Sequence, residues 1–336
     1  MTNPTCQLTI DDLSLGFDAG DDHIRILKNV SLSLERGRML AIVGESGCGK
    51  SMTAHSILRL LPDAARITSG QISLMTGSGE AVEIAALPQH GKVLRSIRGG
   101  EIGMVFQDAM TALNPSHTVG RQTAESLRQH RGVSKEDAKA QVIELFRELG
   151  IPEPETRYGA YPHELSGGMR QRIMIAIAMI NQPSILIADE PTTALDVTIQ
   201  AQIMTLIKRL QSEGDTSVIL ITHNMGVVAE YADDIAVMYM GRVVELGPVH
   251  TVLRSPAHPY TQALVASVPR IDMDRDAPLT TIRGSTPNPT ELGTGCEFAD
   301  RCPVVLPQCR EGLIPLIALT STHRARCVRV EGVSDS

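Results

Sequence analysis

The sequence is poor in aromatic residues and has no long cationic run. Of its 336 residues only 3% are aromatic, and tryptophan is absent. The formal charge is −7, from 31 basic and 38 acidic residues, and no block of lysine and arginine interrupts the chain. Nucleic-acid grooves depend on concentrated positive charge and stacked rings, so this composition argues against a nucleic-acid-binding protein.

Long apolar runs are missing as well. Residues 173–188 form the longest uncharged stretch near the middle of the chain, and they are too few to cross a bilayer. The first residues show neither the basic nor the apolar segment of a signal peptide. The apolar share of 42% is ordinary for a globular protein, which excludes disorder, collagen and coiled coils. We therefore expect a folded protein that works in the cytosol.

Proline and cysteine are concentrated toward the C-terminus. Residues 1–250 contain ten prolines, whereas the last 86 residues contain nine, together with four of the six cysteines. This last part has nine arginines, no lysine and nine acidic residues, so it is neutral and is not a polybasic membrane anchor. The shift in composition predicts two domains, residues 1–250 and residues 251–336.

Strand and helix patterns alternate through the first 250 residues. Three apolar runs have the length of strands buried on both faces: Met39–Val43, Ile185–Ala188 and Val218–Ile221. Asp196 and Ser134 each stand as an N-cap before apolar residues at helical spacing. The order predicts an α/β protein with a parallel core and a helical insert at about residues 110–180.

The central chemical feature is a glycine-rich phosphate-binding loop, the P-loop, between the first apolar run and a predicted helix at 51–61. Its glycines let successive backbone N–H groups turn inward around a phosphate, and the side chains that follow add charge and a metal ligand. Lys50 reaches the β- and γ-phosphates, and the Ser51 hydroxyl binds Mg²⁺. The residues of the loop are Gly44, Glu45, Ser46, Gly47, Cys48, Gly49, Lys50 and Ser51. We assign Cys48 no role beyond its backbone N–H, and we expect its thiol to be sensitive to alkylation.

Two acidic residues follow the second apolar run. Asp189 and Glu190 stand at the C-terminal tip of a buried strand, where open α/β sheets bind their ligands. We expect Asp189 to hold the Mg²⁺ shell and Glu190 to orient and deprotonate an attacking water.

A third element, Leu165–Gln171, places a serine and two glycines before an apolar helix. Exposed N–H groups at a positive helix end make a second anion site. One nucleotide does not need two such sites, so we expect this one to contact the nucleotide of a partner subunit.

Three further elements accompany these motifs: Gln107, Ala194-Leu195-Asp196 and His223. Along the chain the order is the P-loop, Gln107, Leu165–Gln171, the acidic pair, Ala194-Leu195-Asp196 and His223. Over residues 8–250 they resemble the ATP-binding subunit of an ABC transporter, and the Leu-Ser-Gly-Gly run is specific to ABC proteins. The resemblance implies a mixed sheet with a RecA-like lobe, a helical subdomain and a small loop-rich C-terminal extension.

The resemblance also implies roles for individual residues. Gln107 touches Mg²⁺ and the water, Ser166 and Gly168 contact the partner's γ-phosphate, Asp196 lies at the dimer seam, and His223 holds the γ-phosphate. Phe17 stacks on adenine, with His23 as the alternative. The implied catalytic residues are Glu190, His223 and Gln107, and the implied Mg²⁺ ligands are Ser51, Gln107 and Asp189. The implied nucleotide-binding residues are Phe17, Gly44, Glu45, Ser46, Gly47, Cys48, Gly49, Lys50, Ser51, Met52, Gln107, Asp189, Ser166, Gly168 and Asp196.

The C-terminal part resembles the extension of oligopeptide, dipeptide and nickel importers, through His258-Pro259-Tyr260-Thr261 and two cysteine motifs that follow. Its cysteines are separated by 5, 6 and 17 residues: Cys296, Cys302, Cys309 and Cys327. Disulfides are disfavoured in a reducing cytosol. The sequence contains no Cys-x-x-Cys knuckle of the kind that would indicate a zinc site. The subfamily resemblance implies a 4Fe–4S iron–sulfur cluster. Zinc and free cysteines are the alternatives.

Taken together, the resemblance predicts an ATPase subunit that powers import of di- or oligopeptides, with ATP and Mg²⁺. Its expected partners are a second ABC ATPase, identical or homologous, two membrane permeases and an extracytoplasmic solute-binding protein. We expect a peripheral location on the cytoplasmic face of the inner membrane. Nickel or another small solute is the alternative cargo, and a soluble ABC ATPase outside transport is the alternative class.

Overall fold

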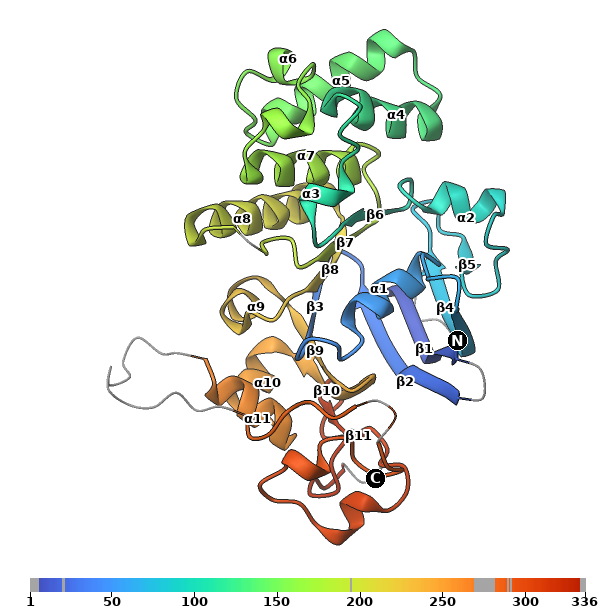
Figure 1. Cartoon of the computed structure of the whole chain (residues 1–336), viewed down its shortest axis with the longest axis vertical. Helices are drawn as coiled ribbons and strands as arrows, with labels where there is room; N and C mark the ends of the chain where they lie inside the picture. The colour runs from blue at the N-terminus through green and yellow to red at the C-terminus, as the bar shows by residue number, and fades with distance from the viewer. Residues whose placement is uncertain are drawn as a thin grey trace.

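The computed structural model describes residues 6–19, 22–193, 195–268, 282–288, 290 and 292–332. These residues fold around two β-sheets, with helices gathered at one end of the molecule and irregular C-terminal segments at the other (Figure 1). Among them, no helix combines the length and the apolar character that a membrane span needs.

The smaller sheet is antiparallel and comes from the N-terminal part of the chain. Its order is β2-β1-β4-β5, made of β1 (Cys6–Ala19), β2 (Asp22–Glu35), β4 (Ala65–Met75) and β5 (Ala81–Glu83). The alternation of Val30, Leu32 and Leu34 with serines places these three side chains in the core, at 5% exposure or less.

The larger sheet is mixed, as expected from the resemblance. Its order is β11-β12-β10-β9-β3-β8-β7-β6. Strands β6 (Ile102–Val105), β7 (Ile185–Asp189), β8 (Ser217–Ile221), β3 (Met39–Val43) and β9 (Asp234–Tyr239) pair in parallel. Strands β10 (Arg242–Pro248), β12 (Arg324–Ala325) and β11 (Ile317–Ala318) extend it antiparallel. The three predicted apolar runs are the neighbours β3, β8 and β7, and every residue in them is buried. Their carboxyl ends therefore meet at one edge, where they form the site.

Helices connect these strands. They are α1 (Lys50–Ile57), α2 (Lys92–Ile97), α8 (Val197–Gly214) and α9 (Met225–Tyr231). Helix α1 ends before the predicted residue 61 because Arg59 takes a left-handed conformation, with φ of 54°. Its guanidinium donates hydrogen bonds to the carbonyls of Ala85 and Leu87, which fixes this end of the helix.

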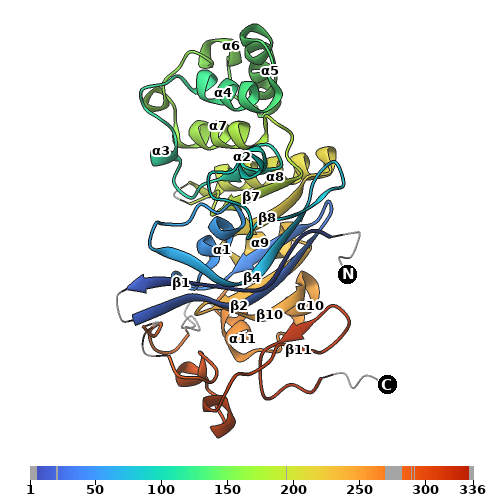
Figure 2. The same cartoon turned by 90° about the vertical axis from the view of Figure 1, so that its right-hand side faces the viewer.

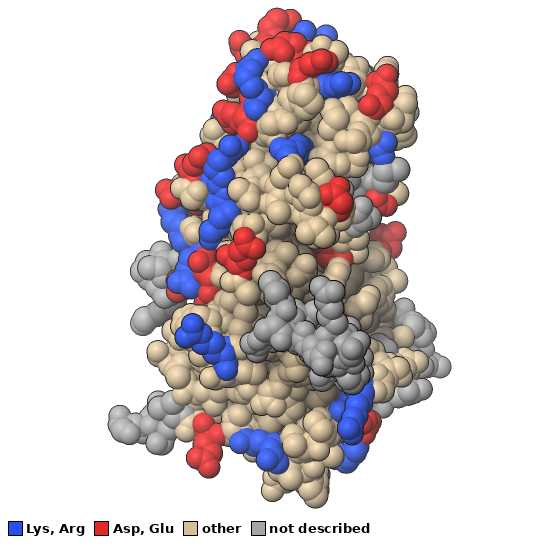
Figure 3. Space-filling model, turned by 90° about the vertical axis from the view of Figure 1, so that its left-hand side faces the viewer, with Lys and Arg blue, Asp and Glu red and all other residues tan. Residues whose placement is uncertain are grey.

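The described chain between β6 and β7 is helical. It forms α3 (Ala109–Ala112), α4 (Val119–Arg131), α5 (Lys135–Glu148), α6 (Pro154–Arg157), the short 3₁₀ helix Pro162–Glu164 and α7 (Gly167–Met179). The stripe that begins at Ser134 is α5, and the Ser134 hydroxyl accepts a hydrogen bond from the Asp137 N–H. Its side chains pack in one cluster with Leu186 and Ala188 of β7, so this layer is built onto the sheet. Figure 3 shows acidic and basic residues interspersed over the helical end of one face.

The C-terminal segments lie at the opposite end of the molecule from these helices (Figure 2). They include α10 (Val249–Arg254), α11 (Pro259–Ala266) and the 3₁₀ helices η3 (Ala299–Arg301) and η4 (Pro307–Arg310). Strand β12 pairs with β10 in the register Glu245 to Ala325. Tyr260 and Phe298 join Val43 in one apolar cluster. The described residues of the predicted C-terminal domain, which we call the C-terminal extension, therefore complete both the larger sheet and the core beside β3.

Candidate nucleotide-binding site

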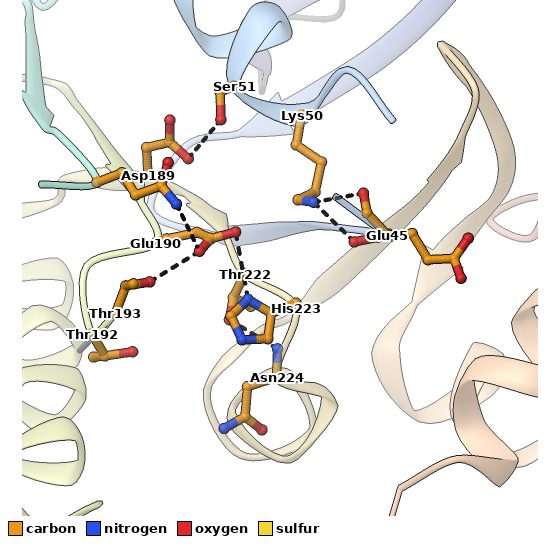
Figure 4. Close-up of polar contacts among 12 residues, drawn as sticks. Glu45, Lys50, Ser51, Asp189, Glu190, Thr192, Thr193, Thr222, His223 and Asn224 are labelled. Atoms are coloured by element: carbon orange, nitrogen blue, oxygen red, sulfur yellow. Dashed lines mark hydrogen bonds and ion pairs between the residues drawn. The ribbon is translucent and has the colours of Figure 1, made fainter. Parts of the chain in front are cut away.

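The P-loop turns directly from β3 into α1. A Cβ atom on Gly44 would lie 2.2 Å from the carbonyl oxygen of Met238, so no other residue fits there. The Lys50 ammonium, at the start of α1, donates hydrogen bonds to the carbonyl oxygens of Gly44 at 2.9 Å and Glu45 at 3.1 Å (Figure 4). The Lys50 side chain thus lies across the loop, and its ammonium group can rotate toward a phosphate that binds there.

Ser51 and Asp189 meet next to the loop. The Ser51 hydroxyl donates a hydrogen bond to Asp189 Oδ1 at 3.2 Å, and Asp189 ends β7 with only 3% of its surface exposed (Figure 4). Burial raises the pKa of Asp189, and the hydrogen bond from Ser51 opposes that shift. A hydroxyl and one carboxylate are oxygen ligands of the kind that Mg²⁺ takes alongside substrate phosphates, so these residues fit the ion.

Glu190 follows Asp189 and turns out of the strand. Its backbone is left-handed, with φ of 47°, and its N–H donates a hydrogen bond to the Ile221 carbonyl at 2.9 Å. One carboxylate oxygen accepts hydrogen bonds from Gln107 Nε2 at 3.2 Å and from the Thr193 hydroxyl at 2.9 Å. The other lies 3.5 Å from His223 Nδ1 (Figure 4). Three side chains, from the segments that follow β6, β7 and β8, therefore converge on this carboxylate.

Thr193 was not among the residues expected from the sequence. Its hydroxyl touches Glu190 because a turn follows the strand, and the Thr193 N–H donates a hydrogen bond to the Glu190 carbonyl at 3.1 Å. Two threonines that follow the acidic pair after Pro191 were the signal that could have indicated it.

His223 lies on a short connection between β8 and α9. Thr222 and Asn224 hold that connection: the Thr222 hydroxyl accepts a hydrogen bond from the Asn224 N–H at 3.0 Å, and Asn224 caps α9. The His223 side chain is 68% exposed, so it remains free to turn toward a ligand.

The serine–glycine element lies elsewhere. Ser166 caps α7 and accepts a hydrogen bond from the Met169 N–H at 3.3 Å, and Asp196 caps α8 through the Ile199 N–H at 2.9 Å. Both views place α7 among the upper helices and α1 well below them (Figures 1 and 2). In the part of the chain that the structure describes, no hydrogen bond joins Ser166, Gly168 or Asp196 to the P-loop. Of the predicted Ala194-Leu195-Asp196 run, Ala194 lies outside the described residues.

Phe17 belongs to the small sheet. It pairs with Ile24 of β2 and Ala65 of β4, and its half-buried side chain packs against the apolar cluster of that sheet. The side chain of the alternative, His23, lies outside the described residues. Stacking of either ring on adenine stays a prediction.

The expected sensitivity of Cys48 to alkylation does not fit its surroundings. The side chain is 1% exposed, and burial raises the pKa of the thiol. A buried neutral thiol is a poor nucleophile, so the residue behaves as a small apolar filler below the loop.

The expected iron–sulfur cluster is not supported either. The four cysteines of the extension are free, and the Cys296 N–H donates a hydrogen bond to the Cys309 carbonyl at 2.7 Å. Burial raises the pKa of Cys296 to about 12 and also raises the pKa values of Cys302 and Cys327. Among the described residues, no three His, Cys, Asp or Glu side chains are grouped to hold a metal ion.

Comparison with known proteins gives matches along the chain. Residues 27–193 match the family described as ABC transporter, and residues 244–309 match the oligopeptide/dipeptide transporter C-terminal region. A putative peptide import ATP-binding protein of Brucella ovis is 46% identical over 97% of this chain and 98% of its own length. The dipeptide transport ATP-binding protein of Bacillus subtilis is 46% identical over 95% and 93%.

Solved structures agree with these relatives. An ATP-binding cassette in a dimeric, post-hydrolysis state bound to ADP and Pi superposes with a TM-score of 0.63 and 29% identity, over 72% of this chain and 98% of that one. A dimeric bacterial ABC transporter cassette gives the same TM-score at 30% identity, with the same coverage of both chains.

Proposed function

The chain belongs to the ATP-binding proteins of ABC transporters, and we propose that this ATPase powers the import of di- or oligopeptides through a membrane transporter. The observation that carries the catalytic part is the convergence of Gln107, Thr193 and His223 on the Glu190 carboxylate, beside the Ser51–Asp189 pair. The direction and the cargo come from the relatives, which are named for peptide import and dipeptide transport.

In this proposal the P-loop and the end of β7 hold the nucleotide. Backbone N–H groups of the loop surround the phosphates, and Lys50 leaves the carbonyls of Gly44 and Glu45 to neutralise phosphate charge. Ser51 and Asp189 hold Mg²⁺, with Gln107 beside them. When bound, the ion neutralises charge that develops on the transferred group.

Glu190 is the proposed general base. Its carboxylate accepts the proton of the attacking water, and Gln107 and Thr193 fix its orientation by hydrogen bonds to the same oxygen. His223 Nδ1 lies 3.5 Å from the Glu190 carboxylate. When a nucleotide is present, His223 gives up this contact and binds the γ-phosphate instead. These side chains need only small rotations, because their elements already bring them together.

The second half of the site comes from another ATPase subunit. The N–H groups at the start of α7, with Ser166 and Gly168, are proposed to contact the γ-phosphate held by the partner's P-loop. Asp196 lies at the seam between the two chains. This arrangement is supported by the exposed position of Ser166 away from the chain's own P-loop and by the dimeric state of the related cassettes.

The complete system is proposed to contain two ATPases, identical or homologous, two membrane permeases and an extracytoplasmic solute-binding protein. The chain then lies on the cytoplasmic face of the membrane as a peripheral subunit. Closure and opening of the ATPase pair drive the permeases through the Gln107 region and the helices from α3 to α7.

The Glu190→Gln variant tests this proposal in two steps. We expect its ATPase rate to fall about a thousandfold, because a general base contributes roughly 10² to 10⁴ in rate. The amide keeps the size of the side chain, so ATP still binds and the closed dimer accumulates. Glu213→Gln, an exposed glutamate on α8, is the matched control and keeps the normal rate.

The same variant, purified from native membranes with MgATP, identifies the assembly by mass spectrometry. Two permeases and a peptide-binding protein are expected to accompany it. Normal hydrolysis by Glu190→Gln contradicts the role of this residue, whereas recovery without permeases contradicts transport. A receptor for nickel or another solute would correct the cargo alone.

A further inference from the structure

Glu45, the second residue of the P-loop, is bound by the C-terminal extension. Arg301, which ends η3, forms a two-pronged ion pair with its carboxylate: Nη1 lies 2.6 Å from Oε2 and Nη2 lies 2.9 Å from Oε1. The side chains are 7% and 25% exposed, respectively. Paired bonds between a guanidinium and a carboxylate fix geometry as well as charge, so this contact differs from an ordinary surface ion pair.

The guanidinium of Arg301 is itself fixed in place. Its Nε donates a hydrogen bond to the Arg283 carbonyl at 2.9 Å, and Nη1 donates one to the Tyr239 hydroxyl at 3.2 Å. Its central carbon lies 5.8 Å and 5.9 Å from the ring centres of Tyr239 and Phe298. The extension therefore presents the arginine in one orientation, aimed at the loop.

Tyr260 of α11 holds the backbone of the same residue. Its hydroxyl accepts a hydrogen bond from the Glu45 N–H at 2.9 Å, and its ring is fully buried. The ring centre lies 4.6 Å from that of Tyr239 and 5.3 Å from that of Phe298, which fixes the hydroxyl. Since Lys50 binds the Glu45 carbonyl, all three polar groups of Glu45 are engaged, and the extension engages two of them.

A carboxylate in this position opposes the binding of a polyphosphate. An unpaired Glu45 would repel the phosphates that the neighbouring N–H groups attract, whereas Arg301 neutralises it. The same contacts hold the loop in shape, and a preformed loop does not lose conformational entropy when a ligand binds.

We propose that the C-terminal extension is a clamp on the P-loop, in which Arg301 and Tyr260 are positioning residues that set the affinity of the loop for MgATP. The clamp rests on the proposed binding of ATP by this loop. It explains why an extension distant in sequence is built into the core beside β3.

The test measures MgATP affinity of the full chain by titration with a fluorescent ATP analogue, together with the KM and kcat of the ATPase. Arg301→Met is expected to weaken binding and raise KM about tenfold, with kcat changed less than about twofold. Arg310→Met is the matched control in the same extension, because Arg310 is 57% exposed and, among the described residues, its one ion-pair partner is the exposed Asp300. It leaves all three quantities unchanged.

A second substitution separates charge from folding. In the Arg301→Met background, Glu45→Gln removes the unpaired charge and is expected to restore MgATP affinity to within about threefold of the starting protein. A purely structural arginine predicts that the double variant stays as weak as the single one, and that result overturns the clamp. Unchanged affinity of Arg301→Met overturns it too.

Tyr260→Phe keeps the buried ring and decides the matter if Arg301→Met does not fold. The loss of the hydroxyl leaves the Glu45 N–H unpaired, and we expect about fivefold weaker MgATP binding. Unchanged affinity of this variant contradicts the clamp. Failure of the unaltered chain to bind MgATP would instead contradict the proposed function.

Discussion

Glu190 of the nucleotide site and Glu245 of β10 each have three partners, and the two sets differ in kind. Glu190 is met by side chains at 2.9 to 3.5 Å, and one of them, His223, is 68% exposed. Glu245 is fully buried and accepts hydrogen bonds from the N–H groups of Ala257 and His258 at 2.8 and 2.9 Å. His323 lies 2.8 Å away on its other side.

The difference separates a site that must change partners from one that must not. Contacts from exposed side chains let Glu190 exchange them for a water or a ligand. Backbone donors and a buried imidazole cannot leave Glu245, so this glutamate ties the segment before α11 and the segment before β12 to the sheet. Replacing a charged group should therefore have opposite effects on stability in the two regions.

The largest effect on stability is expected from Glu245→Ala. Removal of the carboxylate leaves two buried N–H groups and His323 without their partner, which costs about 3 kcal/mol of unfolding free energy. Urea unfolding followed by circular dichroism measures the loss, and Glu213→Ala on the surface of α8 is the control. Stability equal to that of the unaltered chain would show that the extension is not held through this residue. The kcat of the folded protein is expected to stay within about twofold.

Asp189→Asn is expected to act in the opposite direction. Burial raises the pKa of Asp189 above the 3.8 of an exposed aspartate, so the ionised side chain is disfavoured in the folded, ligand-free protein. The penalty is complete above the folded pKa, shrinks as the pH falls through it, and is gone below the unfolded value.

The variant should therefore raise the melting temperature of the ligand-free protein by about 2 °C at pH 8, and by less at pH 4, close to the pKa of an exposed aspartate, while it loses ATPase activity. Scanning calorimetry at both pH values, without nucleotide or Mg²⁺, checks the sign. A lower melting temperature at pH 8 would mean that the hydrogen bond to Ser51 outweighs the burial of charge.

A smaller difference is expected between two cysteines. Cys48 is buried below the P-loop and burial raises its pKa, whereas Cys6 of β1 is partly exposed. Brief treatment of the native chain with iodoacetamide should label Cys48 at less than about a tenth of the extent of Cys6. Peptide mass spectrometry gives both extents from one sample, and denatured protein is the control. Equal labelling would mean that the loop opens often in solution.

The smallest effect is expected at Asp300 and Arg310. Both side chains are more than half exposed although they lie 2.6 Å apart. Asp300→Asn should change the unfolding free energy by less than about 0.5 kcal/mol, because water competes for an exposed ion pair. A larger loss in the same urea experiment would show that this turn of the extension is part of its core.

Much of the nucleotide site could be predicted because its chemistry is local. Gly44 and Lys50 lie in one short loop whose glycines set the backbone, and Asp189 follows a run of apolar residues that becomes a strand buried on both faces. Parallel strands bring their carboxyl ends to one edge, so the meeting of Ser51 and Asp189 follows from their places after two such runs.

Other features depended on contacts between distant segments. Cys48 is shielded from solvent because the surrounding core covers it, and exposure cannot be read from a motif. The subfamily resemblance implied a metal cluster on the cysteines of the extension, yet the described thiols are not grouped as a ligand set. Arg301 and Glu45 are separated by 256 positions, and no periodicity or spacing relates them.

The sequence by itself therefore determined the phosphate loop, the acidic pair and the order of buried strands, because each depends on residues that are neighbours along the chain. The tertiary structure alone decided which side chains surround Glu190 and which segment holds Glu45. Those choices depend on how the sheet orders its strands and on where β12 and α11 pack against β10 and β3. Such packing is set by the sum of many weak contacts across the whole molecule.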